Sequence, residues 1–252
     1  MADVDAWIKA NRLSLNPQKT QLIWLGSRQQ LEKLNMVDIE LVSASLSPLS
    51  AVRNLGVTID SRLSMADHVS AVCRACYFQL RQLRVILQSL TSEAATSLVH
   101  AFISCRLDYC NALLYGIADC HLQRLQSVQN AAARLVTGLR RTEHITPILK
   151  SLHWLPIRQR VTYKLATLMH KCINGRAPGY LAEFCHPCVN RRPGMRSADS
   201  GKLHVPCTQT SFGDRSFAIA GPRTWNNLPD AIRDSTLSFS TFAKLLKSYL
   251  FV

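Results

Sequence analysis

Apolar residues that recur every three or four positions dominate the middle of this 252-residue chain. This period is that of an amphipathic helix, whose apolar stripe must pack against another element. The sequence therefore predicts a helical bundle, and a docked helix is favoured over a coiled coil because the longer repeat covers only three heptads. The two stripes are Val69, Cys73, Cys76, Leu80, Leu83, Leu87 and Leu90, and then Leu122, Leu125, Val128, Ala132, Leu135 and Leu139.

Further helices are predicted around these two. One begins at a Thr91-Ser-Glu cap, one follows Pro156, and the last covers residues 239–251. Residues 185–223 are rich in Pro, Gly, Ser and Arg, which predicts a loop-rich stretch with one strand at 203–205.

The first 60 residues have a different pattern, with a short helix at 3–13 and strand candidates at 20–25, 39–42 and 52–59. These elements are few for an independent core, so we expect this segment to be part of something larger. The predicted fold is mainly α. It comprises a small α+β segment at 1–62, a helical bundle at 63–184 and a loop-rich region ending in a helix at 185–252.

The net charge of +14 is unevenly distributed along the chain. Six basic and six acidic residues cancel within residues 1–60, so the whole excess falls on residues 61–252. Arginine outnumbers lysine 21 to 9, which suits forked contacts with phosphate. The expected partner is a polyanion, most commonly a nucleic acid, and the alternative is a basic surface without a dedicated partner.

Cysteine usage and the apolar runs bear on the compartment. Nine cysteines, an odd number, lie mostly within helical patterns, which indicates reduced thiols in a nuclear or cytoplasmic protein. The acidic start of the chain lacks the features of a signal peptide, so we expect a protein that is not secreted. No apolar run approaches the roughly 18 residues of a membrane span, so no membrane partner is expected.

Several basic residues are candidates for nucleic-acid binding. Arg74 and Arg81 share the polar side of the first helix, seven residues apart. Arg106 falls on the apolar stripe of the next helix, where it either forms an internal salt bridge, extends to solvent or contacts phosphate. A third group lies within about 40° on one helical wheel and is either a solvated face or a phosphate-binding ridge. Its members are Arg160, Lys164 and Lys171.

The sequence lacks the usual catalytic motifs. It contains no adjacent Asp pair, no Gly-rich phosphate loop, no His-x-Asp or His-x-Glu pair and no Gly-x-Ser-x-Gly elbow. Nothing selects a Cys–His nucleophile pair. Lys19 remains a candidate for neutralising or protonating a leaving phosphate, and the alternative is a solvated turn lysine.

One spacing resembles that of a metal site. Cys185 and Cys188 are followed after fifteen residues by His204 and Cys207, and such paired ligands can close a tetrahedral zinc site. His186 is an alternative ligand. Nine scattered cysteines also produce this spacing by coincidence, so both interpretations stay open.

Short motifs in a fixed order resemble the reverse transcriptases of non-LTR (LINE-type, jockey-like) retrotransposons, over almost the entire chain. They are Trp7–Asn11, Leu15–Thr20, Val52–Asp60, Ser104–Leu114, Leu125–Val136, His144–Pro156, Arg196–Asp199 and Trp225–Pro229. The resemblance implies the end of a polymerase palm at 1–62, a helical thumb at 63–184 and the carboxy-terminal region of such an enzyme.

The resemblance also implies roles for individual residues. Leu55 and Gly56 match the primer-grip position, and Lys19 matches a lysine near the leaving pyrophosphate. The aspartates that hold magnesium in the complete enzyme would precede Met1, so we expect this chain alone to bind no cofactor and to be inactive as a polymerase. The family does not require cysteines at 185, 188 and 207, which counts against zinc.

The expected function is that of a truncated RNA-directed DNA polymerase that retains a basic, template–primer-binding thumb. Its expected partners are RNA and RNA–DNA hybrid, and the sequence does not indicate an oligomeric state. The alternative is a non-catalytic helical interaction module or an inert genomic fragment. A continuous basic face would favour the first hypothesis, and evenly dispersed basic residues would favour the second.

Overall fold

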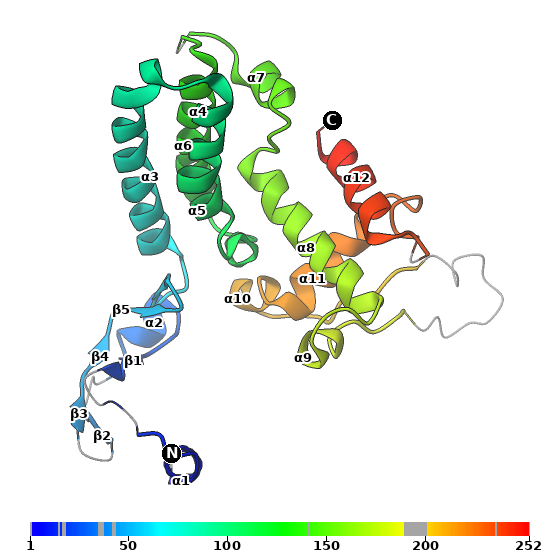
Figure 1. The fold of residues 1–252 in the computed structure, drawn as a ribbon. Coiled ribbons are helices and arrows are strands. Elements are labelled where there is room, and N and C mark those ends of the chain that lie inside the picture. The colour runs from blue at the N-terminus through cyan, green and yellow to red at the C-terminus, as the bar shows by residue number, and fades with distance from the viewer. Residues whose placement is uncertain are drawn as a thin grey trace, which may run out of the picture. The chain divides into compact units, whose positions relative to one another are not determined.

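The computed structural model describes residues 2–14, 16, 19–34, 38–41, 44–140, 142–188, 201–234 and 236–251. The chain divides into two compact units, residues 1–68 and 69–252 (Figure 1). The described residues are mainly helical, and their paired strands all lie in the first unit. The predicted fold class, mainly α with a small α+β part, is confirmed. The predicted three-part division of the chain stays a prediction.

The first unit joins short helices to three strand pairs. Its elements are α1 (Ala2–Ala10), β1 (Leu22–Ile23), α2 (Arg28–Leu31), β2 (Ile39–Leu41), β3 (Ala44–Leu46), β4 (Pro48–Leu49), β5 (Ala51–Asn54) and β6 (Val57–Asp60). Strand β1 pairs in parallel with β4, whereas β2 with β3 and β5 with β6 form antiparallel pairs.

The strand predicted at 52–59 is wrong, because the segment folds back on itself as the β5–β6 hairpin. Leu55 and Gly56 form its two-residue turn with φ values of 46° and 85°. Two central residues of positive φ match the right-handed twist of paired strands, which is why such turns close hairpins. A leucine seldom adopts this conformation, so the turn is hard to predict from the residues alone.

Asp60 fixes the end of β6. Its buried carboxylate accepts hydrogen bonds from the backbone N–H groups of Arg62, Ser64 and Met65, at 3.2, 2.9 and 2.7 Å. Burial acts to raise the pKa of this carboxyl, but the N–H donors outweigh burial and hold the pKa below its usual value. The charged aspartate thus organises the turn that precedes the first long helix.

The second unit is built from helices. Its elements are α3 (Ala66–Ile86, whose first residues belong to the first unit), α4 (Ser92–Val99), α5 (Cys105–Asp108), α6 (Asp119–Thr137), α7 (Ile145–Ser151), α8 (Ile157–Ile173), α9 (Gly179–Ala182), α10 (Ser211–Asp214), α11 (Phe217–Asn226) and α12 (Phe239–Leu250). The predicted cap at Thr91 is confirmed, since its side chain accepts a hydrogen bond from the Ala94 N–H at 3.2 Å. At the end of α6, Gly138 adopts φ 68°, which ends the helix before Leu139.

A π-helical turn (His100–Ser104) separates α4 from α5. The sequence places Arg106 on the same apolar stripe as Val99, and this is wrong. The wider turn shifts the helical phase, so that Ile103 and Leu107 are buried below Val99 whereas Arg106 is exposed. The same shift exposes Phe102 to 40%.

Helices α8, α11 and α12 surround a core centred on Met169, Trp225 and Phe242 (Figure 1). Helix α11 overlaps the stretch predicted to be loop-rich, where Gly221 and Pro222 argue against a helix. The glycine is needed for close packing, because a Cβ there would lie 2.5 Å from the Met169 sulfur. Tertiary packing therefore outweighs the low helix propensity. The predicted strand at 203–205 is reduced to one isolated bridge between Pro187 and Leu203.

Two glutamines of α6 join this helix to the segment that begins α8. The buried Gln129 side chain donates to the Leu155 carbonyl at 2.8 Å, and it accepts from Gln126 at 2.9 Å. The Gln126 oxygen in turn accepts from the Ile157 N–H at 2.9 Å, which satisfies one of the free donors at the start of α8. We call this network the glutamine clamp. It links α6 to the start of α8 through buried groups, and the exposed ion pair between Asp119 and Arg158 is a second polar link between the two helices.

Substitution Gln129→Ala should destabilise the second unit. The change removes one of the two donors to the Leu155 carbonyl, which keeps its hydrogen bond from Arg160, and it removes the acceptor of the Gln126 amide, at a cost of about 0.5–1.5 kcal/mol. Urea unfolding followed by circular dichroism measures the change. Gln123→Ala, at an exposed position of the same helix, is the matched control and should cost less than about 0.5 kcal/mol. Equal stability of the two variants would show that the clamp does not join the helices.

His170 lies inside the α8–α12 core. Its ring stacks on Phe242 with centroids 4.3 Å apart, and its Nε2 lies 3.2 Å from the Leu237 carbonyl oxygen. Burial lowers the pKa of this histidine, the hydrogen bond to the carbonyl opposes that effect, and the nearby Arg176 adds to it. The imidazole is therefore neutral in the folded core at neutral pH.

Stability of the second unit should fall as the pH drops below about 6.5, the ordinary histidine value. Because the pKa of His170 is lowered by folding, the unfolded chain takes up a proton in this range before the folded chain does. Thermal melts from pH 7.5 to 5.0 measure the slope. His170→Leu should flatten the slope over this window, whereas parallel curves for the two proteins would contradict the assignment.

Candidate nucleic-acid interface

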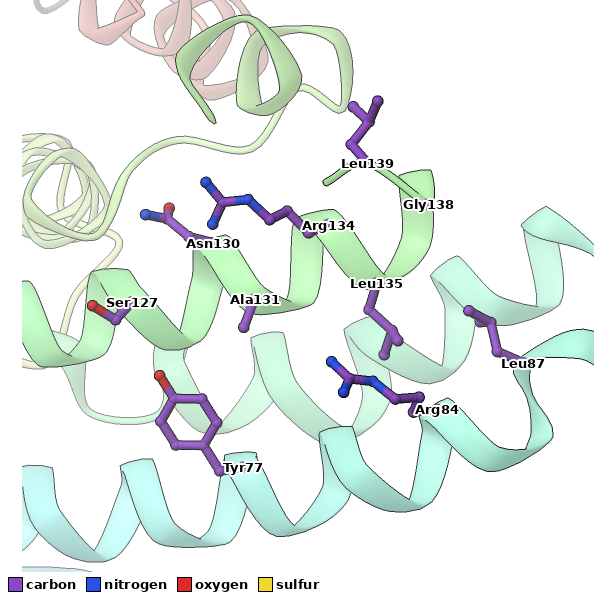
Figure 2. Close-up of a pocket in the computed structure, with 10 residues that line it drawn as sticks. All are labelled: Tyr77, Arg84, Leu87, Ser127, Asn130, Ala131, Arg134, Leu135, Gly138 and Leu139. Carbon is purple, nitrogen blue, oxygen red and sulfur yellow. The ribbon is translucent and has the colours of Figure 1, made fainter. Parts of the chain in front are cut away.

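A groove lies between α3 and α6 in the second unit, with a volume of about 670 Å³ (Figure 2). Tyr77 and Arg84 are directed from α3 toward α6, whereas the side chains of Asn130 and Arg134 extend from α6 on the side away from α3. The complete lining is Tyr77, Arg84, Leu87, Ser127, Asn130, Ala131, Arg134, Leu135, Gly138 and Leu139. The groove thus combines two guanidinium groups with a phenol and an amide.

Helix α3 carries a row of basic and aromatic side chains beside its buried stripe. The row is spaced by three, four and three residues, which places its members on one side of the helix, and all are exposed. We call it the α3 stripe, and its members are Arg74, Tyr77, Arg81 and Arg84. The sequence predicts Arg74 and Arg81 as binding residues, whereas Tyr77 and Arg84 were missed, although their regular spacing was a usable signal.

The opposite wall is formed by α6. Arg134 donates one long hydrogen bond of 3.4 Å to the Glu143 carbonyl. Its Nε is buried and has no partner among the described residues. The sequence alone did not single out Arg134 or Asn130 for binding, because their positions on the polar side of α6 also suit a solvated face.

Two further arginines influence the buried thiols of α3. Burial raises the pKa of Cys76 to about 11, and the charge of Arg106 partly opposes this effect. Burial likewise raises the pKa of Cys73, which the charge of Arg124 partly lowers. Arg106 and Arg124 are exposed and lie close enough to α3 to add to its positive potential. The structure thus places Arg106 near α3, a proximity that its position on the predicted apolar stripe did not indicate.

This arrangement suits a nucleic-acid backbone. Guanidinium groups bind phosphate oxygens in a forked geometry, and an exposed tyrosine offers a face for base stacking. Among the described residues no ion pair involves Arg74, Arg81 or Arg84. Their charges are therefore available to a polyanion.

The three basic residues predicted as a ridge on α8 have different environments. Arg160 is 13% exposed and forms an ion pair with Asp108 at 2.7 Å, and it also donates to the Leu155 carbonyl. Lys171 places its Nζ 5.2 Å from the centre of the Phe239 ring. Lys164 is exposed and lines a second, smaller cavity. The structure therefore engages Arg160 internally and does not present the three cations as equivalent phosphate contacts.

The candidates of the first unit lie in turns. Lys19 is exposed and its N–H donates to the Asn16 carbonyl at 3.1 Å. Leu55, at the tip of the β5–β6 hairpin, is 84% exposed. Part of the motif at residues 15–20, and the whole motif at 196–199, lie outside the described residues.

The predicted zinc ligands are not brought together. Cys188 and His204 lie in a short backbone ladder, in which Cys188 donates to the Lys202 carbonyl at 3.0 Å and His204 donates to the His186 carbonyl at 2.8 Å. The Cys185 sulfur instead lies 4.0 Å from that of Met169. Where the chain is described, no three His, Cys, Asp or Glu side chains are grouped so as to hold a metal ion.

Comparison with known proteins connects the chain to mobile elements. It is 32% identical over 140 residues to a probable RNA-directed DNA polymerase from transposon BS of Drosophila melanogaster. The match covers 52% of this chain and 15% of the fly protein. This chain is therefore related to a transposon RNA-directed DNA polymerase, which is the part of the predicted resemblance that the comparison confirms.

The remaining comparisons add nothing to this relationship. No family model matches the chain, and no solved structure matches it.

Within the described ranges, no helix is both long and apolar enough to cross a membrane.

Thiol labelling should report on the packing of α3. Cys73, Cys76 and Cys172 are buried with raised pKa values, so a maleimide at pH 7.5 should leave them unmodified in the folded protein. The exposed thiols should react within minutes, and they are Cys105, Cys110, Cys120, Cys188 and Cys207. Peptide mass spectrometry resolves the sites. Modification of Cys76 as fast as of Cys105 would show that the inner face of α3 is open.

Proposed function

We propose that this chain holds the template–primer duplex of a retrotransposon reverse transcriptase, and that the α3 stripe and the groove beside it contact the phosphate backbone. The observation that carries the proposal is the row of arginines on α3 without described acidic partners. The similarity to a transposon RNA-directed DNA polymerase supports it independently. The substrate class is an RNA–DNA hybrid or an RNA duplex. Binding is not sequence-specific, because contacts with phosphates carry no information about the bases.

Within this proposal the chain corresponds to the carboxy-terminal part of a jockey-like, non-LTR enzyme. Residues 1–62 represent the end of the palm, where Lys19 faces the leaving pyrophosphate and Leu55 with Gly56 touches the primer. Helices of the second unit represent the thumb. The match to 15% of the fly polymerase supports such a partial correspondence. Within this proposal the aspartates that hold magnesium belong to another part of the complete enzyme. The proposed location is nuclear or cytoplasmic.

A helical module for protein binding is the second candidate, because α3 also exposes apolar side chains. Phe78 is 51% exposed and Val85 is 79% exposed. Exposed apolar residues on one helix are typical of a docking face when they form a continuous patch. This candidate predicts that removal of arginine charge changes little and that nucleic acid does not bind.

Affinity for a hybrid duplex should fall steeply with salt if the stripe contacts phosphates. Each phosphate contact contributes about 0.9 to the slope of log affinity against log salt concentration. The experiment measures fluorescence anisotropy of a labelled 16-base-pair RNA–DNA hybrid with the whole chain between 50 and 300 mM salt. A slope near zero, or no binding at 50 mM salt, would refute the proposal and favour the protein-binding module.

Charge removal on α3 should weaken this binding. Arg74→Gln, Arg81→Gln and Arg84→Gln should each reduce affinity about three- to tenfold at 100 mM salt and lower the salt slope by about 0.9. Arg176→Gln removes the same charge from an exposed position outside the groove and is the matched control. Equal losses for all four variants would indicate attraction by net charge alone and would contradict a specific role for the stripe.

A further inference from the structure

A second cavity of about 360 Å³ lies in the second unit, where α8 meets α12 and the turn after α5. Its lining includes Asp108, Asn111, Arg160, Tyr163, Lys164 and Lys247. This volume is in the range of pockets that bind small molecules. None of these residues belongs to the groove between α3 and α6.

A buried amide lines this cavity without being satisfied. The Asn111 side chain is 4% exposed, and its Nδ2 donates to Asp108 Oδ1 at 3.4 Å. Its Oδ1 is buried and accepts no hydrogen bond from the described residues. Buried carbonyl oxygens of this kind nearly always have a donor, so the amide is suited to a ligand that carries an N–H or O–H group.

An ion pair holds the wall on which the amide lies. Asp108 Oδ2 accepts from Arg160 at 2.7 Å, and the Nε of that arginine donates to the Leu155 carbonyl at 2.8 Å. The carboxylate therefore contacts the amide with one oxygen and α8 with the other. These contacts hold the amide with its nitrogen toward Asp108, and its oxygen has no described donor.

The rim of the cavity is positively charged. Arg160 neutralises Asp108, and the exposed Lys164 and Lys247 add two further cations. A simple anion would satisfy the lysines but would leave most of this cavity of about 360 Å³ unfilled. The lining also contains Tyr163, a half-buried aromatic side chain that offers a face to a flat ring.

We propose that this cavity binds one unpaired nucleotide, with the base donating to Asn111 Oδ1 and its phosphate between Lys164 and Lys247. The same chemistry is offered by a free mononucleotide and by an unpaired residue of a bound strand. The assignment to a strand rests on the proposed function, in which α3 holds the adjoining duplex. The cavity then distinguishes a strand with an overhanging nucleotide from a blunt duplex.

The first test measures binding of AMP, ribose 5-phosphate and inorganic phosphate to the whole chain by calorimetry. AMP should bind at least tenfold more tightly than the other two, because it alone provides both a base and a phosphate. Lys247→Gln should weaken AMP about threefold, and Asn111→Ala about five- to tenfold. Lys244→Gln, on the same helix but outside the cavity lining, is the charge-matched control and should leave AMP binding unchanged.

Equal affinity for the three probes would overturn the proposal and indicate an anion site only. AMP binding that Lys247→Gln does not change would also overturn it. The lysine variant keeps this test valid if Asn111→Ala does not fold, since Lys247 is exposed.

The second test separates the strand from the free nucleotide and separates this proposal from the proposed function. A hybrid with one unpaired nucleotide should bind about threefold more tightly than a blunt hybrid, and Lys247→Gln should abolish this difference without changing blunt-duplex affinity. Arg84→Gln should weaken both duplexes equally. If neither duplex binds but AMP does, the proposed function fails and the cavity is a site for free nucleotide. If both duplexes bind equally in the unmodified protein, the strand assignment fails while the role of α3 stands.

Discussion

The glutamine clamp is the interaction on which the arrangement of the second unit depends. Gln129 is buried at 1% exposure in the middle of α6, and its side chain reaches the Leu155 carbonyl just before α8 begins. One side of α6 thus anchors the segment that starts α8, while another side forms a wall of the groove facing α3. A buried amide of this kind restricts the register between helices, because any displacement leaves a desolvated donor and acceptor unpaired. Apolar packing alone tolerates small shifts more readily.

The ion pair between Asp108 and Arg160 has a comparable role at the same end of α8, where Arg160 also donates to the Leu155 carbonyl. It joins the turn after α5 to α8 and lies beside the Asn111 amide. The arginine is largely buried, so loss of the aspartate would leave a poorly solvated charge. Both candidate sites therefore depend on polar contacts to α8 or α6, made by residues that a stripe of apolar positions does not reveal.

The sequence predicted the helices well because their signals are local. The stripe from Val69 to Leu83, the cap at Thr91 and the proline before α8 each depend on residues a few positions apart. Helix α11 was missed because Gly221 and Pro222 are poor helix formers, and only the tight contact with Met169 in α8 explains the glycine. The exposure of Arg106 was missed because a π-helical turn has no sequence signature that a regular period of 3.6 residues detects. On α3 the spacing identified Arg74 and Arg81 but not Arg84, which lines the groove, and Arg134 required the partner helix to be seen.

The distribution of acidic residues explains why the charge on α3 stays free. In the second unit the aspartates that form described ion pairs are bound to arginines outside α3: Asp108 to Arg160, Asp119 to Arg158, Asp214 to Arg223 and Asp230 to Arg233. Helix α3 itself contains one acidic residue, Asp67. It lies in the first turn, where the positive end of the helix dipole stabilises a negative charge. The arginines further along therefore have no acidic neighbour on their own helix.

Since an exposed ion pair stabilises a fold by less than about 1 kcal/mol, leaving these arginines unpaired costs little stability. The same charges produce a strong local potential for a polyanion, because their effects on an approaching phosphate backbone add. A basic surface that served solubility alone would not need arginine at regular helical spacing beside a groove.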